Sequence, residues 1–155
     1  MVSDSGPLIS LEKIRNGYDF IRKLYKKIIV PLSVIEELSY GLRLPPNGYL
    51  EAYNIKDLVE IRPVIKEKQP EIKGIECLHL AEADAILLAM QMQCPLLIEE
   101  TISRRLALEA GLKISGIAGT IVRALRQGVI VRDEAVTKTE ELLNGGQRLT
   151  LSVNA

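Results

Sequence analysis

Acidic side chains stand at four points along this chain, each next to an expected strand or helix. Asp4 follows a short opening segment, Glu37 lies beyond an apolar segment, and Asp84 opens a long helical pattern. Glu99 and Glu100 directly follow a second apolar segment. Carboxylates that lie together repel one another and are costly to desolvate, so they persist mainly where a cation sits between them. Hard oxygen ligands without His or Cys favour Mg²⁺ or Mn²⁺ as the cofactor.

The first two acids also have structural explanations that the residues leave open. Asp4 alternatively serves as an ordinary cap of the helix that begins near Pro7. Ser33 and Glu36 have the S-x-x-E spacing of a capping box, which assigns Glu36 to the helix start. Glu37 is therefore the expected ligand.

The later acids are similarly open. Asp84 shares a helical face with Leu80 and Leu87, where an unpaired carboxylate is costly, whereas Glu82 projects roughly 200° away and is the weaker candidate. The helix dipole alone favours acids in a first turn, and this applies equally to Glu99 and Glu100 before the next helix. The sequence does not indicate which of Glu99 and Glu100 faces the site.

The elements that must position these acids alternate between strands and helices. A strand tip at residues 1–4 is expected to run straight into a helix. Further strands are expected at 27–30, 61–65, 95–98 and 113–115, and helices at about 18–25, 33–40, 78–93, 101–110, 117–127 and 133–143. The pattern predicts an α/β fold with a mainly parallel sheet covered on both faces, and sites in such folds form beyond the carboxyl ends of the strands.

The bulk composition limits the classes of protein that remain. The 155 residues are 47% hydrophobic and 26% charged, which fits one domain over residues 1–155, with the tail at 145–155 either an edge strand or flexible. Twenty basic and twenty acidic residues cancel, so any nucleic-acid binding must come from local clusters. The basic segment at 22–27 is one such cluster, although a solvated helix face explains it better. No signal sequence or membrane span is evident, so a soluble, cytoplasmic protein is expected.

Five segments in this order resemble the PIN domain, most closely the prokaryotic branch related to the VapC-like toxin ribonucleases of toxin-antitoxin modules. The segments are Val2–Leu11, Val30–Leu38, Ala83–Ala89, Leu96–Arg105 and Ile114–Ile130, which together span nearly the whole chain. The resemblance implies a three-layer α/β/α PIN-like fold and a metal-dependent endoribonuclease that hydrolyses RNA. It also implies Asp4, Glu37 and Asp84 as metal ligands, an antitoxin protein as a partner, and a homodimer or higher homo-oligomer.

The departures from that family pattern concern residues around the expected site. Gly6 replaces the more usual Ser, Ala81 stands where Gly is frequent, and Glu99 takes the place of an Asp. A catalytically inactive PIN-like protein that binds RNA or a partner is therefore the alternative function. A receiver-like signalling domain fits less well, because it requires adjacent acids after the first strand and a mid-chain phosphoacceptor Asp.

Three further residues are expected to contact the substrate. Ser5 either binds an Asp4 oxygen or the RNA phosphate, or merely caps the helix. Arg104 and Arg105 begin the helix after the fourth acid and either contact phosphate or remain solvated. Carboxylates that hold one or two divalent ions would activate a bound water for in-line attack on the phosphodiester.

Overall fold

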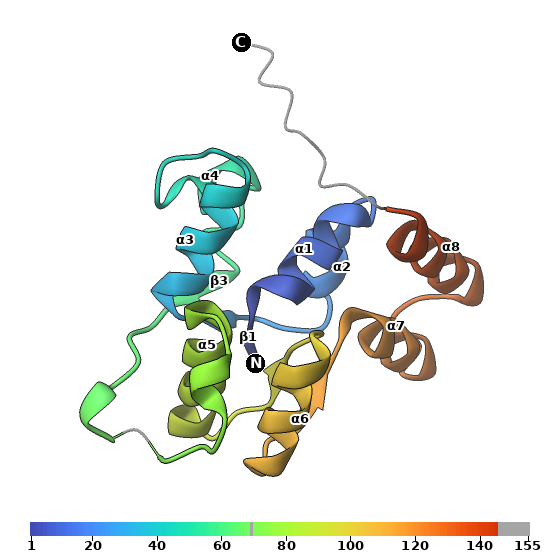
Figure 1. The fold of residues 1–155 in the computed structure, drawn as a ribbon. Coiled ribbons are helices and arrows are strands. Elements are labelled where there is room, and N and C mark those ends of the chain that lie inside the picture. The colour runs from blue at the N-terminus through green and yellow to red at the C-terminus, as the bar shows by residue number, and fades with distance from the viewer. Residues whose placement is uncertain (69, 146–155) are drawn as a thin grey trace.

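The computed structural model describes residues 1–68 and 70–145, in which strands alternate with helices (Figure 1). The strands are β1 (Val2–Ser3), β2 (Ile28–Val30), β3 (Val59–Ile61), β4 (Leu96–Leu97) and β5 (Ile114–Ser115). The helices are α1 (Ser5–Lys13), α2 (Gly17–Arg22), α3 (Leu32–Gly41), α4 (Gly48–Ala52), α5 (Leu80–Met92), α6 (Thr101–Glu109), α7 (Ile117–Arg126) and α8 (Arg132–Asn144). Short 3₁₀ turns lie at Lys66–Lys68 and Ile75–Cys77.

The described strands form one five-stranded parallel sheet in the order β3-β2-β1-β4-β5. Val2 of the central strand pairs with Ile29 on one side and Leu96 on the other. The chain therefore builds the sheet outward from β1 in two directions, first towards β3 and later towards β5. The space beyond the ends of β1 and β4, where the direction reverses, is where open parallel sheets bind ligands.

Helices cover both faces of the sheet, because the strands are apolar on both faces. In β2, Ile28 and Val30 belong to a core with helices α1 to α4, α7 and α8, while Ile29 belongs to a second core with α5 and α6. This alternation places the two cores on opposite faces. The predicted three-layer α/β/α fold with a mainly parallel sheet is confirmed.

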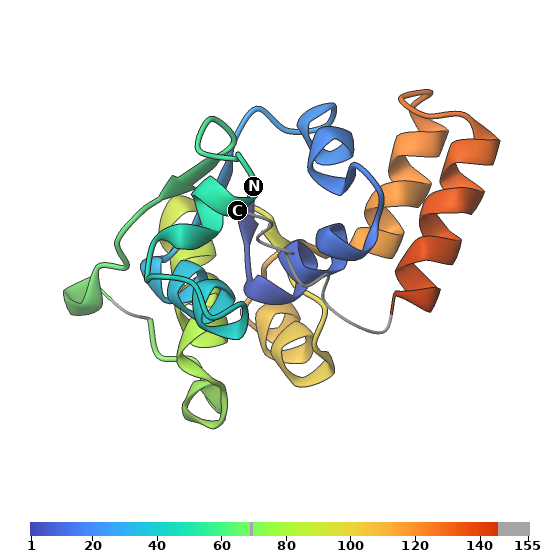
Figure 2. The same ribbon diagram turned by 90° about the horizontal axis from the view of Figure 1, so that it is seen from above.

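The last two helices form an antiparallel pair at one end of the molecule (Figure 2). Ile121 of α7 and Ala135 of α8 are buried in the larger core, and α8 carries its other apolar residues at the surface or partly buried. The amide of Arg15, after α1, donates to the Glu141 carboxylate at 3.0 Å and so connects this hairpin to the beginning of the chain.

The expected strand at 61–65 is wrong. The third strand ends at Ile61, because Pro63 has no N–H to continue the ladder. After the Pro45–Pro46 turn the chain forms the helix α4, an element that the sequence patterns did not predict. The tail residues 146–155, for which an edge strand was an alternative, lie outside the described residues.

Within the described ranges, no helix is long and apolar enough to cross a membrane.

The backbone approaches itself closely where α1 turns into α2. A Cβ atom added to Gly17 would lie 2.1 Å from the Leu11 carbonyl oxygen, a distance that no side chain tolerates. The Gly17 amide also donates to the Ile14 carbonyl at 3.0 Å, so the turn has no freedom to open. Glycine at this position lets α2 fold back beside the helix that carries Ser5.

We expect Gly17→Ala to destabilise the protein by about 1–3 kcal/mol, because the backbone of one helix must shift to admit the methyl group. The matched control is Gly119→Ala in α7, where the nearest atom to the added Cβ is the Ser115 hydroxyl at 3.6 Å. That change should be neutral or stabilising by up to about 1 kcal/mol. Urea unfolding midpoints measure both, and equal midpoints for the two variants would contradict this account of the turn.

Candidate metal-binding active site

Asp4 lies at the point where the sheet reverses its direction of growth. It directly follows β1, and its amide donates to the Leu97 carbonyl of β4 at 3.0 Å. The residue is 3% exposed, and its side chain makes no N-cap hydrogen bond to α1. The structural explanation of Asp4 as an ordinary helix cap is therefore wrong.

Burial raises the pKa of the Asp4 carboxyl from 3.8 to about 6, and the negative charges of Glu82 and Glu37 add to this rise. Hydrogen bonds from Ser5 offset only part of it. Among the described residues, no ion pair to Lys or Arg involves Asp4. The carboxyl is thus buried near other acids, with no Lys or Arg partner in the part of the chain that the structure describes.

Ser5 joins Asp4 to Glu37. Its hydroxyl lies 2.6 Å from a Glu37 carboxylate oxygen and 3.3 Å from an Asp4 oxygen. Because a hydroxyl has one proton, the shorter contact is the hydrogen bond and the longer one is weak at best. Ser5 therefore holds Glu37 of α3 against the first turn of α1, beside Asp4.

A second serine–carboxylate pair lies one turn earlier on α3. The Ser33 hydroxyl donates to an Asp84 oxygen at 2.6 Å, and Asp84 is half-buried. Ser33 and Glu37 are four residues apart and so share one face of α3. Through Glu37 and Ser33, this face of α3 contacts the first turn of α1 and the beginning of α5. Both α1 and α5 begin near the end of β1 (Figure 1).

The expected capping box at Ser33 and Glu36 is wrong. The helix begins earlier, at Leu32 with Pro31 in the N-cap position and no side-chain cap, so Ser33 is already inside it. The Ser33 hydroxyl is instead committed to Asp84, and Glu36 is exposed.

Glu82 has a larger role than its position on a helical wheel suggests. Its carboxylate accepts a hydrogen bond from the His79 amide at 3.1 Å, and its charge raises the pKa of Asp4. A long side chain in the first turn of α5 reaches past the helix end, where its angular position matters little. From the sequence, Glu82 ranks as the weaker candidate; its length and its place at a helix start are the signals that could have found it.

Glu99 is held by two groups from distant parts of the chain. Its carboxylate accepts from the Ser10 hydroxyl at 2.5 Å and from the Ile117 amide at 2.9 Å. It runs past Gly6, where an added Cβ would lie 3.8 Å from the Glu99 Cβ, and past Gly116 at the start of α7. Glu99 therefore connects β4 to α1 and α7 beside the candidate site.

Glu100 caps α6. One of its oxygens accepts from the Ile102 amide at 2.9 Å and the Ser103 amide at 3.1 Å. These bonds, with the one from the Ser103 amide contributing most, lower the pKa of Glu100. Of the two acids that the sequence left open, Glu99 is the one that adjoins the first turn of α1.

The two arginines of α6 differ in their surroundings. Arg104 is half-buried and donates to the Ile98 carbonyl at 2.8 Å, close to Gly116. Arg105 is exposed and lies 4.0 Å from Glu109. Their contact with a substrate stays a prediction.

The basic segment at 22–27 lies at the opposite end of the sheet from Asp4. Arg22 binds Asp57 and the Asn54 carbonyl, just before β3, and Lys27 directly precedes β2. Lys27 donates to the Asp57 carbonyl at 2.6 Å. The interpretation of this segment as a helix face is wrong, because α2 ends at Arg22 and residues 23–27 form the turn that leads into β2.

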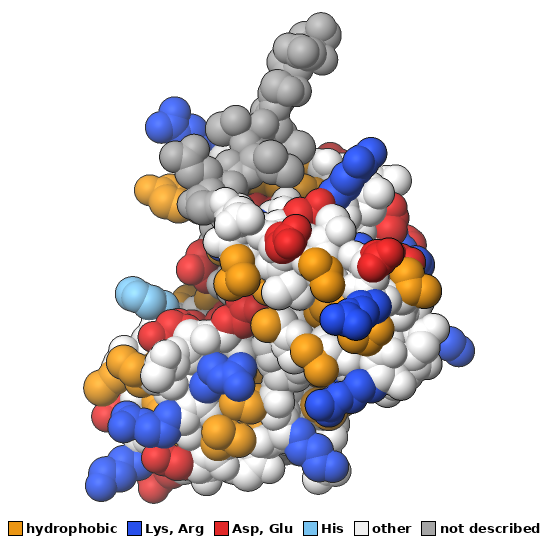
Figure 3. Space-filling view, turned by 90° about the vertical axis from the view of Figure 1, so that its right-hand side faces the viewer, with side chains coloured by type: hydrophobic (Ala, Val, Ile, Leu, Met, Phe, Trp, Pro, Cys, Tyr) orange, Lys and Arg blue, Asp and Glu red, His pale blue; other side chains and the backbone are white. Residues whose placement is uncertain are grey.

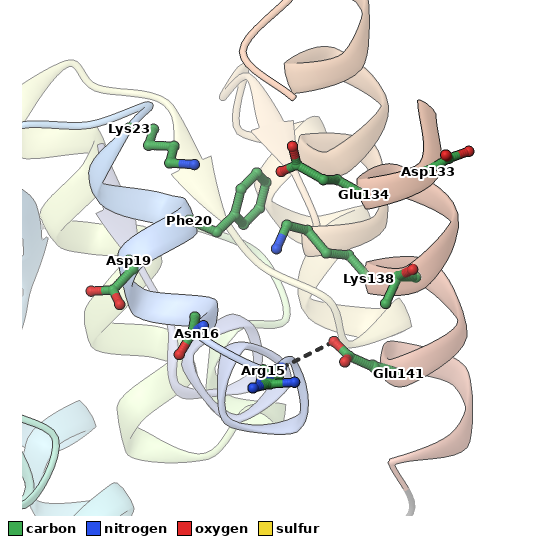
Figure 4. A pocket seen from close by; sticks show the side chains of 10 residues that line it. Arg15, Asn16, Asp19, Phe20, Lys23, Asp133, Glu134, Lys138 and Glu141 are labelled. Carbon is green, nitrogen blue, oxygen red and sulfur yellow. Dashed lines mark hydrogen bonds between the residues drawn. The ribbon is translucent and has the colours of Figure 1, made fainter. Parts of the chain in front are cut away.

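Acidic side chains gather at mid-height on one face of the molecule, with basic side chains mostly below them (Figure 3). A cavity of about 660 Å³ borders the candidate site and is lined partly by Ser33 and Glu37. Another cavity, of about 470 Å³, lies between α2 and α8 around Phe20 and Lys138 (Figure 4) and includes none of the predicted site residues.

The carboxylates that raise the pKa of Asp4, those of Glu82 and Glu37, are donors of the kind that fit a divalent metal ion. Carboxylate oxygens are the ligands that Mg²⁺ and Mn²⁺ prefer, and a cation would relieve the burial and repulsion at Asp4. In the described ranges, no three acidic, His or Cys side chains lie close enough to form a ready-made metal site. Glu37 and Glu82 are long and are held by Ser5 and the His79 amide, so binding would require their side chains to turn.

The parallel sheet has helices on both faces, and carboxylates lie where the order of its strands reverses. This is a nuclease-type α/β fold. A family model described as a PIN domain matches residues 1–154, and the chain belongs to this family. PIN domains are generally nucleases and typically use divalent metals. No curated protein and no solved structure matches the chain significantly.

The raised pKa of Asp4 predicts a pH dependence of stability without metal. Because the folded state holds the proton more tightly than the unfolded state, this stabilisation is complete below pH 3.8 and is lost as the pH rises through about 6. The difference corresponds to an upper limit of roughly 3 kcal/mol. Asp4→Asn should therefore be more stable than the parent at pH 7.5 in EDTA, by about 1–3 kcal/mol.

Urea unfolding at pH 4, 6 and 7.5 measures this difference, which should shrink towards pH 4. Asp133→Asn, at an exposed position in α8, is the control and should show no gain that grows with pH. An Asp4→Asn variant that is less stable than the parent at pH 7.5 would contradict an unpaired buried carboxylate.

Proposed function

We propose that this chain is a Mg²⁺- or Mn²⁺-dependent ribonuclease that hydrolyses RNA phosphodiester bonds. The observation that carries this proposal is the buried carboxyl of Asp4, placed where the sheet reverses and surrounded by the charges of Glu37 and Glu82. Such an arrangement destabilises a protein unless a cation compensates it. Membership of the PIN family supports the same conclusion.

The proposed metal-holding residues are Asp4, Glu37 and Asp84, with Glu82 as an additional carboxylate of the same site. When bound, the ion would lower the pKa of a water molecule and stabilise the charge that develops on the phosphate. Ser5 orients Glu37, and Ser33 orients Asp84, each by one short hydrogen bond.

Ser5, Arg104 and Arg105 are the proposed substrate contacts. The Ser5 hydroxyl lies between two candidate ligands, so a phosphate oxygen near the ion would be within its reach. Arg104 uses one guanidinium nitrogen on the Ile98 carbonyl, which leaves further N–H donors for a phosphate. Arg105 is exposed in the middle of the same helix.

The finer biological assignment rests on the sequence motifs that resemble VapC-like toxins. We propose a cytoplasmic toxin component of a toxin-antitoxin module, with an antitoxin protein as its partner. A homodimer or higher homo-oligomer belongs to the same proposal. Most apolar residues at 18–40 are buried within the chain, and Leu32 and Tyr40 are the exposed large ones in that range.

Self-association is tested directly by light scattering over a wide range of protein concentrations. The expected mass is a multiple of 17.2 kDa. A mass of one chain at high concentration would refute the oligomer and leave the proposed chemistry untouched.

A second candidate function is an RNA- or partner-binding PIN-like protein that does not cleave. The engagement of Glu99 favours it, because both carboxylate oxygens of this fourth acid are occupied by Ser10 and Ile117. If cleavage requires the fourth acid at the metal, this chain would bind without hydrolysis.

Substitution of the acids, with two independent readouts, separates these functions. In the parent, Mn²⁺ should raise the melting temperature and allow cleavage of single-stranded RNA. Asp4→Asn and Asp84→Asn should keep or raise the melting temperature in EDTA, lose most of the Mn²⁺-induced increase and abolish cleavage. Glu99→Gln should keep the Mn²⁺-induced increase, since Glu99 is proposed here to bind protein groups.

Glu140→Gln serves as the control, because Glu140 is exposed on α8 and lines neither the candidate site nor its cavity. Asp84→Asn cleaving as fast as the parent, with the same metal dependence, would remove Asp84 from the site. In that case Glu82→Gln should lose most of the Mn²⁺-induced increase in melting temperature and should not cleave RNA, as expected of a metal ligand. A parent that binds Mn²⁺ and RNA without cleaving would favour the second function.

A further inference from the structure

The cavity of about 660 Å³ extends the candidate site along α3. Glu37, which accepts from Ser5 beside Asp4, lines one side of it. Tyr40 and Leu44 lie further along the chain on the same side, and Leu80 at the start of α5 lies opposite. We call this cavity the Tyr40 groove. An occupant of the groove would contact a candidate metal ligand.

Two large apolar side chains of the groove belong to neither hydrophobic core, so packing does not explain why they are apolar. Tyr40 is 86% exposed and Leu80 is 67% exposed, although α3 and α5 otherwise bury apolar faces. An exposed aromatic ring beside a site for phosphodiester hydrolysis has an evident chemical use, because bases stack on aromatic side chains. The volume also lies in the range of about 300–1,000 Å³ that is usual for ligand sites.

The charges around the groove indicate which part of a nucleotide it suits. Of the residues that the structure describes, no Lys or Arg lines it, whereas Glu36 and Glu37 do. A phosphate would be repelled there, and an uncharged base would not. His79, also at the rim, offers a polar group to the edge of a base.

We propose that the Tyr40 groove takes an unpaired base next to the scissile phosphate, with the Tyr40 ring as its stacking surface. This inference rests on the proposed function and adds to it a binding site for one base beside the cleaved bond. A base paired and stacked within a duplex cannot enter the groove without leaving its stack. The alternative occupant, a protein segment, is distinguished by the experiment.

The experiment measures binding and cleavage separately. Binding uses the Asp4→Asn chain, which leaves the groove intact, with short single-stranded RNAs that carry 2-aminopurine at successive positions. Stacking quenches the fluorescence of 2-aminopurine. Quenching should occur at one or two positions, and a hairpin that pairs those positions should bind more weakly.

Removal of the ring is the decisive change. Tyr40→Ala in the Asp4→Asn background should abolish the quenching and weaken binding by about 5- to 150-fold. Tyr40→Phe keeps the ring and should retain both. Leu143→Ala, a 78% exposed apolar position on α8, is the matched control and should have no effect. The same Tyr40 substitutions in the parent chain should alter KM for single-stranded RNA more than kcat.

Each contrary result overturns the inference in a recognisable way. Unchanged quenching in Tyr40→Ala, or equal losses in Tyr40→Ala and Tyr40→Phe, would rule out stacking on the ring. Unchanged RNA binding together with a lower mass in light scattering would make the groove an interface between protein chains. Cleavage that is unaffected by Tyr40→Ala would overturn the inference while the proposed function stands. Absence of RNA binding by the parent and by Asp4→Asn would overturn both.

Discussion

The electrostatic cost of one buried carboxyl, that of Asp4, determines how the rest of this site is arranged. The residue follows the central strand, so its backbone is fixed by the amide that donates to β4, and it is only 3% exposed. Neighbouring acids add to the cost of burial and do not relieve it. A fold tolerates such a position when its function requires it, since stability elsewhere must compensate for the loss.

Serine hydroxyls, and not cations, organise the acids around Asp4. Ser5, Ser33 and Ser10 each donate one short hydrogen bond to a different carboxylate, those of Glu37, Asp84 and Glu99 respectively. A hydroxyl fixes the direction of a carboxylate without neutralising its charge, whereas Lys or Arg would remove the charge that attracts a metal ion. The site thus keeps its negative charge and still holds its side chains in defined directions.

Much of this arrangement follows from sequence patterns, and its failures have physical causes. Apolar segments such as Ile28–Val30 predict buried strands, and the parallel topology then brings Asp4 and the start of α3 to one edge. Patterns fail where a local signal has more than one use. Ser33 has the spacing of a cap but serves Asp84, because Pro31 already begins the helix.

The fourth acid shows a limit of a different kind. Its position after β4 is predictable from order along the chain, but its partners are 89 and 18 residues away. Only the tertiary fold brings Ser10 and the Ile117 amide to Glu99. From the sequence alone, Glu82 also ranks below Asp84 as a candidate ligand, because the three-dimensional structure is lacking. A helical wheel describes angles around the helix axis and not how far a side chain reaches beyond the helix end.

The bond between Glu99 and the Ile117 amide also connects two regions that would otherwise open independently. Helix pairs at the edge of a fold commonly exchange their amide hydrogens through local unfolding, without involving the rest of the molecule. Here the first amide of α7 is held by a carboxylate that is also bonded to α1, so opening of the α7–α8 hairpin from this end releases Glu99. The local stability of the C-terminal hairpin is therefore one of the quantities that set the orientation of a carboxylate beside Asp4.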